Sequence, residues 1–127
     1  MKVADIMQRS VVTVSEETPI KEVGRLIFSL GIAGLPVVKN KKLVGIVTEE
    51  DILRKIHPSV ADYMEDPIHA GDFVSMEKNL VEILNAPAKK IMSKHVTSAD
   101  PDIPLIKAQS IMAINNFSRL PIVNKDN

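Results

Sequence analysis

The sequence predicts an α+β protein built from two β-α-β-β-α units with a helical insertion between them. The first observation is an internal repeat, and the second is the alternation of short β-branched runs with apolar stripes at helical spacing. Three pairs of segments carry the repeat: Ile6-Met7 with Ile91-Met92, Pro19-Ile20 with Pro104-Leu105, and Leu35-Pro36-Val37-Val38 with Leu120-Pro121-Ile122-Val123. The members of every pair are 85 residues apart, which indicates a tandem duplication.

Composition narrows the function classes. The 127 residues suffice for one ordinary domain or for two small units that share a core. Sixteen basic and sixteen acidic side chains balance, and aromatic residues make up 3%, which argues against binding to nucleic acid or to an anionic membrane. The absence of cysteine excludes disulfides, thiolate catalysis and zinc–thiolate sites. Without a signal-like N-terminus or an apolar span, we expect a cytoplasmic protein.

The first unit, expected over residues 1–57, opens with a strand and a helix. The β-branched run at residues 11–14 predicts the strand. Pro19 suits the first turn of a helix, where a missing N–H costs little, and Gly31 and Gly34 indicate where the helix stops. Apolar side chains then follow one another at 3-4-3 spacing along one predicted helix face: Ile20, Val23, Ile27 and Leu30.

A hairpin and a second helix complete this unit. The apolar runs at residues 35–39 and 43–47 flank a polar turn at residues 40–42, so the two strands must be antiparallel. Thr48 followed by Asp51 has the pattern of a capping box, in which hydroxyl and carboxylate satisfy free helical N–H groups. Such a helix start also suits a phosphate. On these residues alone, a simple cap is the favoured interpretation and a ligand site the alternative.

The segment from 58 to 87 separates the units and contains a predicted helix. Its apolar residues have helical spacing over residues 73–84, which predicts a helix packed on the pair of units: Phe73, Met76, Leu80, Ile83 and Leu84.

The second unit, expected over residues 88–127, repeats the first only in part. Residues 95–98 predict its strand, and Pro104 begins its helix, whose stripe contains one polar residue: Leu105, Ala108, Met112 and Asn115. After the run at residues 120–123, the sequence holds no returning strand and no Thr-x-x-Asp helix. Either the chain is a truncated piece, or another chain supplies these elements.

The doubled pattern resembles a pair of CBS domains, the tandem arrangement called a Bateman module. The matching segments cover about three quarters of the chain: the two Ile-Met openings, Val12-Thr13-Val14, Gly34-Leu35-Pro36-Val37-Val38, and the stretch from Leu43 through Thr48 and Asp51 to Leu53. The resemblance implies two units related by pseudo-two-fold symmetry, with two clefts between them. Each cleft is implied to hold an adenosine-containing ligand such as AMP, ADP, ATP or S-adenosylmethionine.

The resemblance also implies ligand residues for each cleft. In the first cleft, Thr48 would meet the phosphate and Asp51 the ribose hydroxyls, with four further residues around them: Ala33, Gly34, Thr97 and Ser98. The second cleft would use Thr13, Val14, Ser118 and Arg119, the last at a position where family members often carry a phosphate-binding cation. A solvated surface arginine is an equal alternative for Arg119. We expect the acid in one cleft and the arginine in the other, and the first cleft to be the better nucleoside site.

These residues favour a regulatory module that senses an adenosine-containing ligand and passes a change of shape to a partner. The alternative is an interaction scaffold that dimerises and binds no small molecule. We expect a homodimer formed through the CBS helices, with no cofactor beyond the regulatory ligand and no catalytic residues. A metal site is not expected, because His57, His69 and His95 are scattered and the carboxylates of Glu49, Glu50 and Asp51 point in different directions on a helix.

Overall fold

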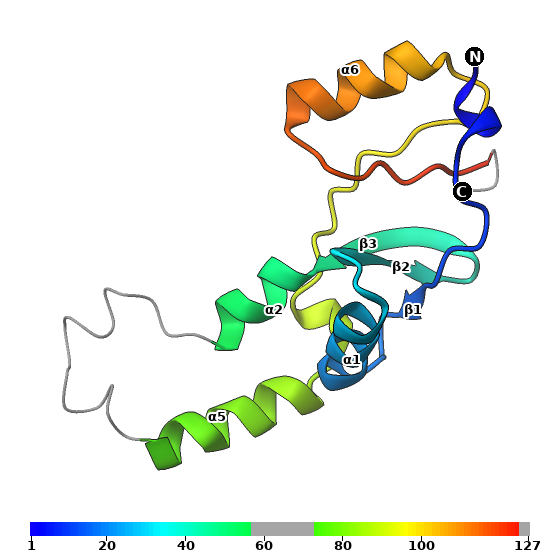
Figure 1. Ribbon diagram of the computed structural model, residues 1–127. Helices are drawn as coiled ribbons and strands as arrows, with labels where there is room; N and C mark the ends of the chain where they lie inside the picture. The colour runs from blue at the N-terminus through cyan, green and yellow to red at the C-terminus, as the bar shows by residue number, and fades with distance from the viewer. Residues whose placement is uncertain (57–72, 125–127) are drawn as a thin grey trace.

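The computed structural model describes residues 1–56 and 73–124 and confirms the predicted α+β class. The helices and strands follow one another in chain order as shown in Figure 1: η1 (Val3–Asp5), β1 (Val14–Ser15), α1 (Ile20–Leu30), β2 (Gly34–Lys39), β3 (Lys42–Thr48), α2 (Glu49–Ile56), α5 (Phe73–Asn85), η2 (Ala88–Lys90) and α6 (Leu105–Asn115). They form two parts. The sheet lobe contains β1 to α2 with α5 and η2, and the small lobe contains η1, α6 and residues 99–124.

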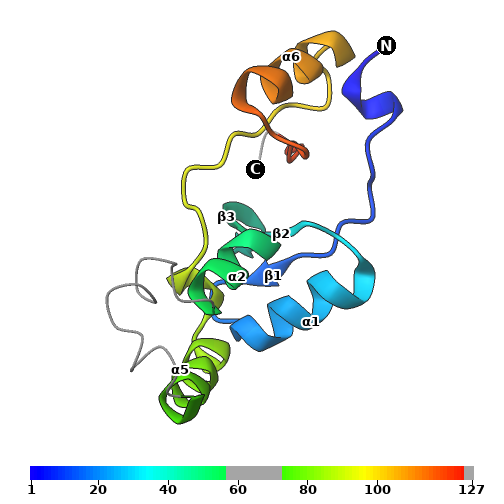
Figure 2. The ribbon, with the colours of Figure 1, turned by 60° about the vertical axis from the view of Figure 1, so that its left-hand side comes forward.

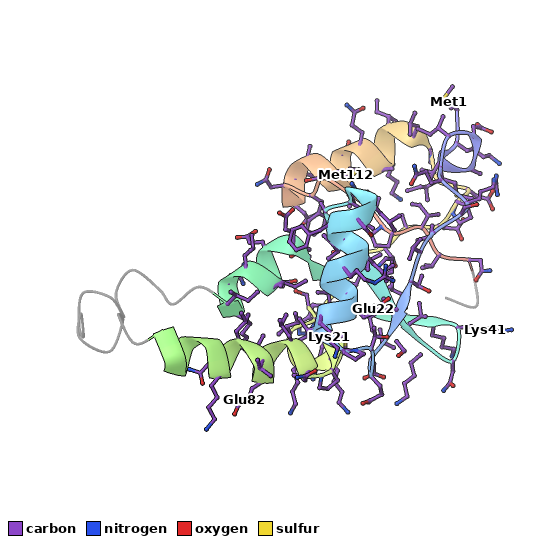
Figure 3. The ribbon with its side chains drawn as sticks, turned by 60° about the horizontal axis from the view of Figure 1, so that its bottom comes forward. Met1, Lys21, Glu22, Lys41, Glu82 and Met112 are labelled. Atoms are coloured by element: carbon purple, nitrogen blue, oxygen red, sulfur yellow. The ribbon has the colours of Figure 1, made fainter. Side chains whose placement is uncertain are left out.

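The sheet of the sheet lobe has the order β1-β2-β3. Strand β1 runs parallel to β2, with Val14 opposite Val37, and β2 runs antiparallel to β3, with Gly34 opposite Thr48. Asn40 and Lys41 both have positive φ, 52° and 65°, as a two-residue type I′ hairpin turn requires. Lys41 lies at the tip of this hairpin and points away from the core (Figure 3). The predicted hairpin is confirmed.

Helix α1 covers the sheet with the predicted stripe, except at its last position. Ile20, Val23 and Ile27 are at most 1% exposed, whereas Leu30 is 51% exposed. The cause is the helix end: Gly31 takes a left-handed conformation, φ 65°, and the N–H of Ile32 bonds the Ile27 carbonyl at 3.1 Å. Leu30 is thus the last helical residue, and after the left-handed turn at Gly31 it is Ile32 that packs against the core.

The predicted insertion helix is also confirmed, as α5. It contacts α1 and α2 of the sheet lobe, where Ile83 and Leu84 pack against the core. The rest of the insertion, residues 57–72, lies outside the described part of the chain. No helix in the described ranges combines the length and hydropathy needed to cross a bilayer.

The first strand of each unit begins later than predicted. Strand β1 starts at Val14, while Val11 and Val12 are 54% and 43% exposed. In the second unit the only pairing of this kind within the described residues is a parallel bridge from Ala99 to Ile122, the equivalent of Val14 and Val37. The upstream residues instead connect the lobes: residues 8–13 and 93–98 run between them as two separate segments, which stand on opposite sides of the molecule in Figure 2, and most of their residues have no strand partner (Figures 1 and 2).

The opening segment of each unit packs on the other unit. Three backbone hydrogen bonds recur at the offset of 85 residues. In the sheet lobe they run from Ile20 N–H to Ala86 O (2.9 Å), from Ala88 N–H to Thr18 O (2.8 Å) and from Lys89 N–H to Glu16 O (3.0 Å). Their equivalents in the small lobe run from Leu105 N–H to Met1 O (2.9 Å), from Val3 N–H to Ile103 O (3.1 Å) and from Ala4 N–H to Pro101 O (2.9 Å). The equivalent side chains of Ala88 and Val3 are both buried, at 0% and 4% exposure. This reciprocal exchange is the pseudo-two-fold relation that holds the lobes together.

Candidate functional site

A cavity of about 440 Å³ lies between the two lobes. Four chain segments line it: residues 33–36 at the start of β2, the junction of β3 with α2, the connecting residues 93–97, and residues 116–121 after α6. This volume lies within the range of small-molecule sites, roughly 300–1,000 Å³. The cavity is therefore large enough for a ligand that touches both repeats.

Equivalent loops of the two units face this cavity. Ala33 and Gly34 correspond to Ser118 and Arg119 at the offset of 85 residues, and all four residues line the cavity. Space for a side chain at Gly34 is tight, because a Cβ there would lie 3.0 Å from the Val47 carbonyl oxygen and 3.3 Å from Thr48 Cγ2, so that these neighbours would have to shift by a few tenths of an ångström. The pair of loops therefore supplies one cation, Arg119.

Thr48 and Asp51 form the predicted capping box. The Thr48 N–H donates to Asp51 Oδ2 at 2.9 Å, and the Asp51 N–H donates to Thr48 Oγ1 at 3.2 Å. The other carboxylate oxygen of Asp51 lies 3.9 Å from the Arg54 guanidinium, and the Asp51 side chain is 14% exposed. Thr48 lines the cavity, but the lining carboxylate is that of the neighbouring Glu50, which pairs with Arg54 at 3.2 Å.

The structure groups the predicted site residues differently from the sequence. It brings together six of them in the one cavity: Ala33, Gly34, Thr48, Thr97, Ser118 and Arg119. Ser98 and Asp51 are not among its lining residues. Thr13 is exposed on the connecting segment, and Val14 is 6% exposed in the core of the sheet lobe. Thr48 and Arg119 thus line one cavity, whereas the family resemblance assigns them to two clefts; Ser118 and Arg119 also line a second hollow without Thr48, so the assignment to two clefts stays a prediction.

Sequence reasoning missed several residues that line the cavity: Glu50, His95, Asn116 and Phe117. The repeat offset would have pointed to two of them, since Asn116 and Phe117 directly precede the equivalents of Ala33 and Gly34. Asn116 also has φ 56°, and so ends α6 as Gly31 ends α1. His95 lies two residues before Thr97, the predicted site residue of the same connecting segment, and lines the same cavity.

The charges around the cavity favour an anion. Within the described residues, Arg119 forms no salt bridge, whereas Glu50 is paired with Arg54. On the sheet lobe, a hydrogen bond from Arg25 lowers the pKa of Glu22, and a hydrogen bond to Glu17 raises the pKa of Lys89. The described ranges contain no cluster of three potential metal ligands.

A second hollow, of about 660 Å³, lies on the small lobe. Its apolar wall includes Ala108, Met112, Leu120 and Ile122. The sheet-lobe equivalents of these four positions are at most 1% exposed: Val23, Ile27, Leu35 and Val37. Ser118 and Arg119 line this small-lobe groove as well as the cavity. The groove is thus the core-facing side of the small lobe, left open.

Comparisons with known proteins place the chain. The model of the CBS domain matches residues 3–58 and 88–127. The protein MJ1426 of Methanocaldococcus jannaschii is 34% identical over 140 residues, an alignment that includes 99% of this chain and 82% of that protein. An inosine-5′-monophosphate dehydrogenase of Thermoplasma acidophilum is 46% identical over 114 residues, or 88% of this chain, but the match spans only 23% of the dehydrogenase.

Solved structures share the fold. Protein MJ1225 of Methanocaldococcus jannaschii superposes with a TM-score of 0.79 at 29% identity over 98% of this chain and 41% of its own. The structure of CBSX2 in complex with AMP superposes with a TM-score of 0.72 at 22% identity, over 98% of this chain and 83% of its own. The CBS domain pair of MJ0100, in complex with 5′-methylthioadenosine and S-adenosyl-L-methionine, gives a TM-score of 0.67 at 23% identity over 98% and 82%. With two matched segments, a shared fold and a repeat visible in its hydrogen bonds, the chain belongs to the CBS domain family.

Proposed function

We propose that this protein is a regulatory module that binds an adenosine-containing ligand, such as AMP, ADP, ATP or S-adenosylmethionine, in the cavity between its lobes. One observation carries the proposal: equivalent loops of both repeats, one with an arginine that has no salt bridge within the described residues, line a cavity of about 440 Å³. The fold neighbours CBSX2 and MJ0100, which hold AMP and S-adenosyl-L-methionine, support this ligand class.

In this proposal the phosphate lies near Arg119 and Thr48. A guanidinium binds phosphate through paired N–H groups, and the Thr48 hydroxyl can donate its proton while its oxygen accepts from Asp51 N–H. Two carboxylates are candidates for the ribose hydroxyls. Glu50 lines the cavity, whereas Asp51 already accepts the Thr48 N–H and so acts on the ligand chiefly through Thr48.

The ligand would act on a partner by changing how the lobes sit together. Both lobes contribute lining residues, so a ligand that binds better to one arrangement shifts the population toward it. No catalytic step is part of the proposal. The match to the dehydrogenase covers less than a quarter of that enzyme, so its activity does not transfer to this chain.

A calorimetric titration with AMP, ATP and S-adenosylmethionine tests the proposal. We expect micromolar binding of at least one ligand, and a loss of about tenfold or more in AMP affinity for Arg119→Gln. Lys21→Gln is the matched control, because it removes one positive charge from an exposed position on α1 that does not line the cavity (Figure 3). Comparing Glu50→Gln with Asp51→Asn identifies the ribose acceptor. Absence of heat at protein concentrations well above about 10 μM overturns the proposal.

One observation favours a second function, that of an interaction scaffold. The small-lobe groove is apolar and open, and α6 also exposes Ile106 and Ile114, at 74% and 83%. Exposed apolar residues gathered on one element are typical of protein-binding surfaces. If such helices form a homodimer, sedimentation equilibrium should show the apparent molecular mass rising from that of a monomer to twice that value as the protein concentration increases. Ile114→Asp would then return the protein to the mass of a monomer, and an unchanged mass would contradict the scaffold.

A further inference from the structure

His95 lies in the cavity on a segment whose position is fixed. Two residues before it, Ser93 pairs with Ile46 of β3 through both backbone hydrogen bonds, at 2.9 Å and 3.1 Å. The segment packs closely on β3 at Gly45, where a Cβ would lie 2.7 Å from Met92 Sδ and 3.0 Å from the Ser93 oxygen. His95 therefore enters the cavity from a strand-like anchor on the sheet lobe.

The charged groups around His95 leave its imidazole available to a ligand. Arg119 and Glu50 line the same cavity, Glu50 is paired with Arg54, and Lys94 is the exposed neighbour in sequence. Within the described residues, no hydrogen bond or ion pair engages the His95 side chain, which is exposed. An uncharged imidazole offers a phosphate one N–H, whereas an imidazolium offers a full positive charge in addition.

We infer that His95 is a second phosphate-binding group beside Arg119, so that the cavity prefers phosphorylated adenosine ligands and binds them more tightly as the pH falls. This inference rests on the proposed function. Arg119 is charged at all relevant pH values, and histidine is the side chain that ordinarily gains its charge between roughly pH 8 and pH 5. The effect levels off near pH 6, because a phosphate monoester itself takes up a proton there, with a second pKa of about 6.

Titrations of AMP and adenosine at pH 8, 7 and 6 test the inference. We expect AMP to bind roughly threefold to fivefold more tightly to the wild-type protein at pH 6 than at pH 8. The expected gain is modest because solvent screens an exposed ion pair between imidazolium and phosphate. In His95→Gln this gain disappears, while Lys94→Gln keeps it. Adenosine affinity stays constant with pH in all three proteins. At pH 7, AMP binding takes up protons in the wild type but not in His95→Gln, a difference that a purely structural role of His95 would not produce.

The possible failures are distinguishable. If AMP binds but His95→Gln retains the wild-type pH dependence, the role of His95 is wrong and the proposed function survives. If adenosine shows the same pH dependence as AMP, the phosphate is not the group that His95 meets. If no ligand binds at any pH, both proposals fall. Thermal melts of His95→Gln at each pH show whether the variant is folded.

Discussion

The two lobes share an opening segment, a parallel pairing and a first helix, but they differ in how far they bury equivalent side chains. Leu35 is 1% exposed in the sheet lobe, whereas its equivalent Leu120 is only partly buried and lines the small-lobe groove. The hydrogen bonds of the exchanged opening segments are nevertheless the same in both lobes. What differs is the cover: β3 and α2 supply Val47 and Ile52, at 0% and 2% exposure, to the core of the sheet lobe.

The difference in burial between the lobes shows that an element can form with its backbone hydrogen bonds and still contribute little to stability. The opening segment, the parallel pairing and the first helix are present in both lobes, with equivalent backbone hydrogen bonds. Burial of apolar area, which contributes about 25 cal/mol per Å², needs the additional strand and helix. The sheet lobe is therefore expected to carry most of the free energy of unfolding, and the small lobe to depend on its contacts with it.

The largest expected effect comes from Leu35→Ala, compared with Leu120→Ala. The two changes remove the same atoms at equivalent positions, but Leu35 is buried and Leu120 borders an open groove. Leu35→Ala should lower the free energy of unfolding by about 2–5 kcal/mol, and Leu120→Ala by roughly 1 kcal/mol. Urea denaturation measures both. Equal losses would mean that the small-lobe groove is filled in solution.

Gly45→Ala should have the next largest effect. A methyl group there meets Met92 Sδ and the backbone oxygen of Ser93, so the connecting segment must move away from β3. Overpacking of this kind costs about 1–3 kcal/mol. We also expect weaker AMP binding, since the same segment leads to His95. The double variant Gly45→Ala/Met92→Ala should recover only part of the stability, because the contact with the backbone remains.

Gly24→Ala should act in the opposite direction. Gly24 is buried within α1, but a Cβ there would lie 3.8 Å from Ile52 Cδ1, an ordinary contact distance. Alanine is favoured over glycine in helices by up to about 1 kcal/mol, so we expect a stabilisation of that order. The equivalent small-lobe residue is Gln109, which is exposed. A loss of stability in thermal unfolding would show that α1 and α2 pack more tightly than these distances indicate.

Lys89→Gln should have the smallest effect. Lys89 Nζ lies 2.8 Å from Glu17 Oε1 and joins the exchanged segment to the sheet lobe, but the two side chains are 43% and 71% exposed. The hydrogen bond to Glu17 raises the pKa of Lys89. Because the pKa of Lys89 is higher in the folded than in the unfolded state, the ion pair stabilises the protein fully when the pH is below the unfolded-state pKa. This stabilisation is lost as the pH rises through the folded-state pKa. The difference in Tm between wild type and variant should therefore be small near pH 7, vanish in strongly alkaline solution, and shrink with added salt.

Local patterns in the sequence determined much of this fold. The repeat offset, the hairpin around Asn40 and Lys41, the capping box of Thr48 and Asp51, and helix α5 are all confirmed. Each of these features joins residues close in the chain, or repeats one pattern at a constant distance. Their energies depend on neighbours that the sequence places side by side.

Only the tertiary structure decided where the first strands begin, and which residues meet between the lobes. Strand β1 starts at Val14 because pairing with β2 begins there, and residues 8–13 cross to the other lobe. Arg119 joins Thr48 and His95 because each opening segment packs on the opposite unit, through hydrogen bonds between residues such as Ile20 and Ala86. Contacts over such separations depend on the relative placement of whole elements, and no local periodicity encodes that placement.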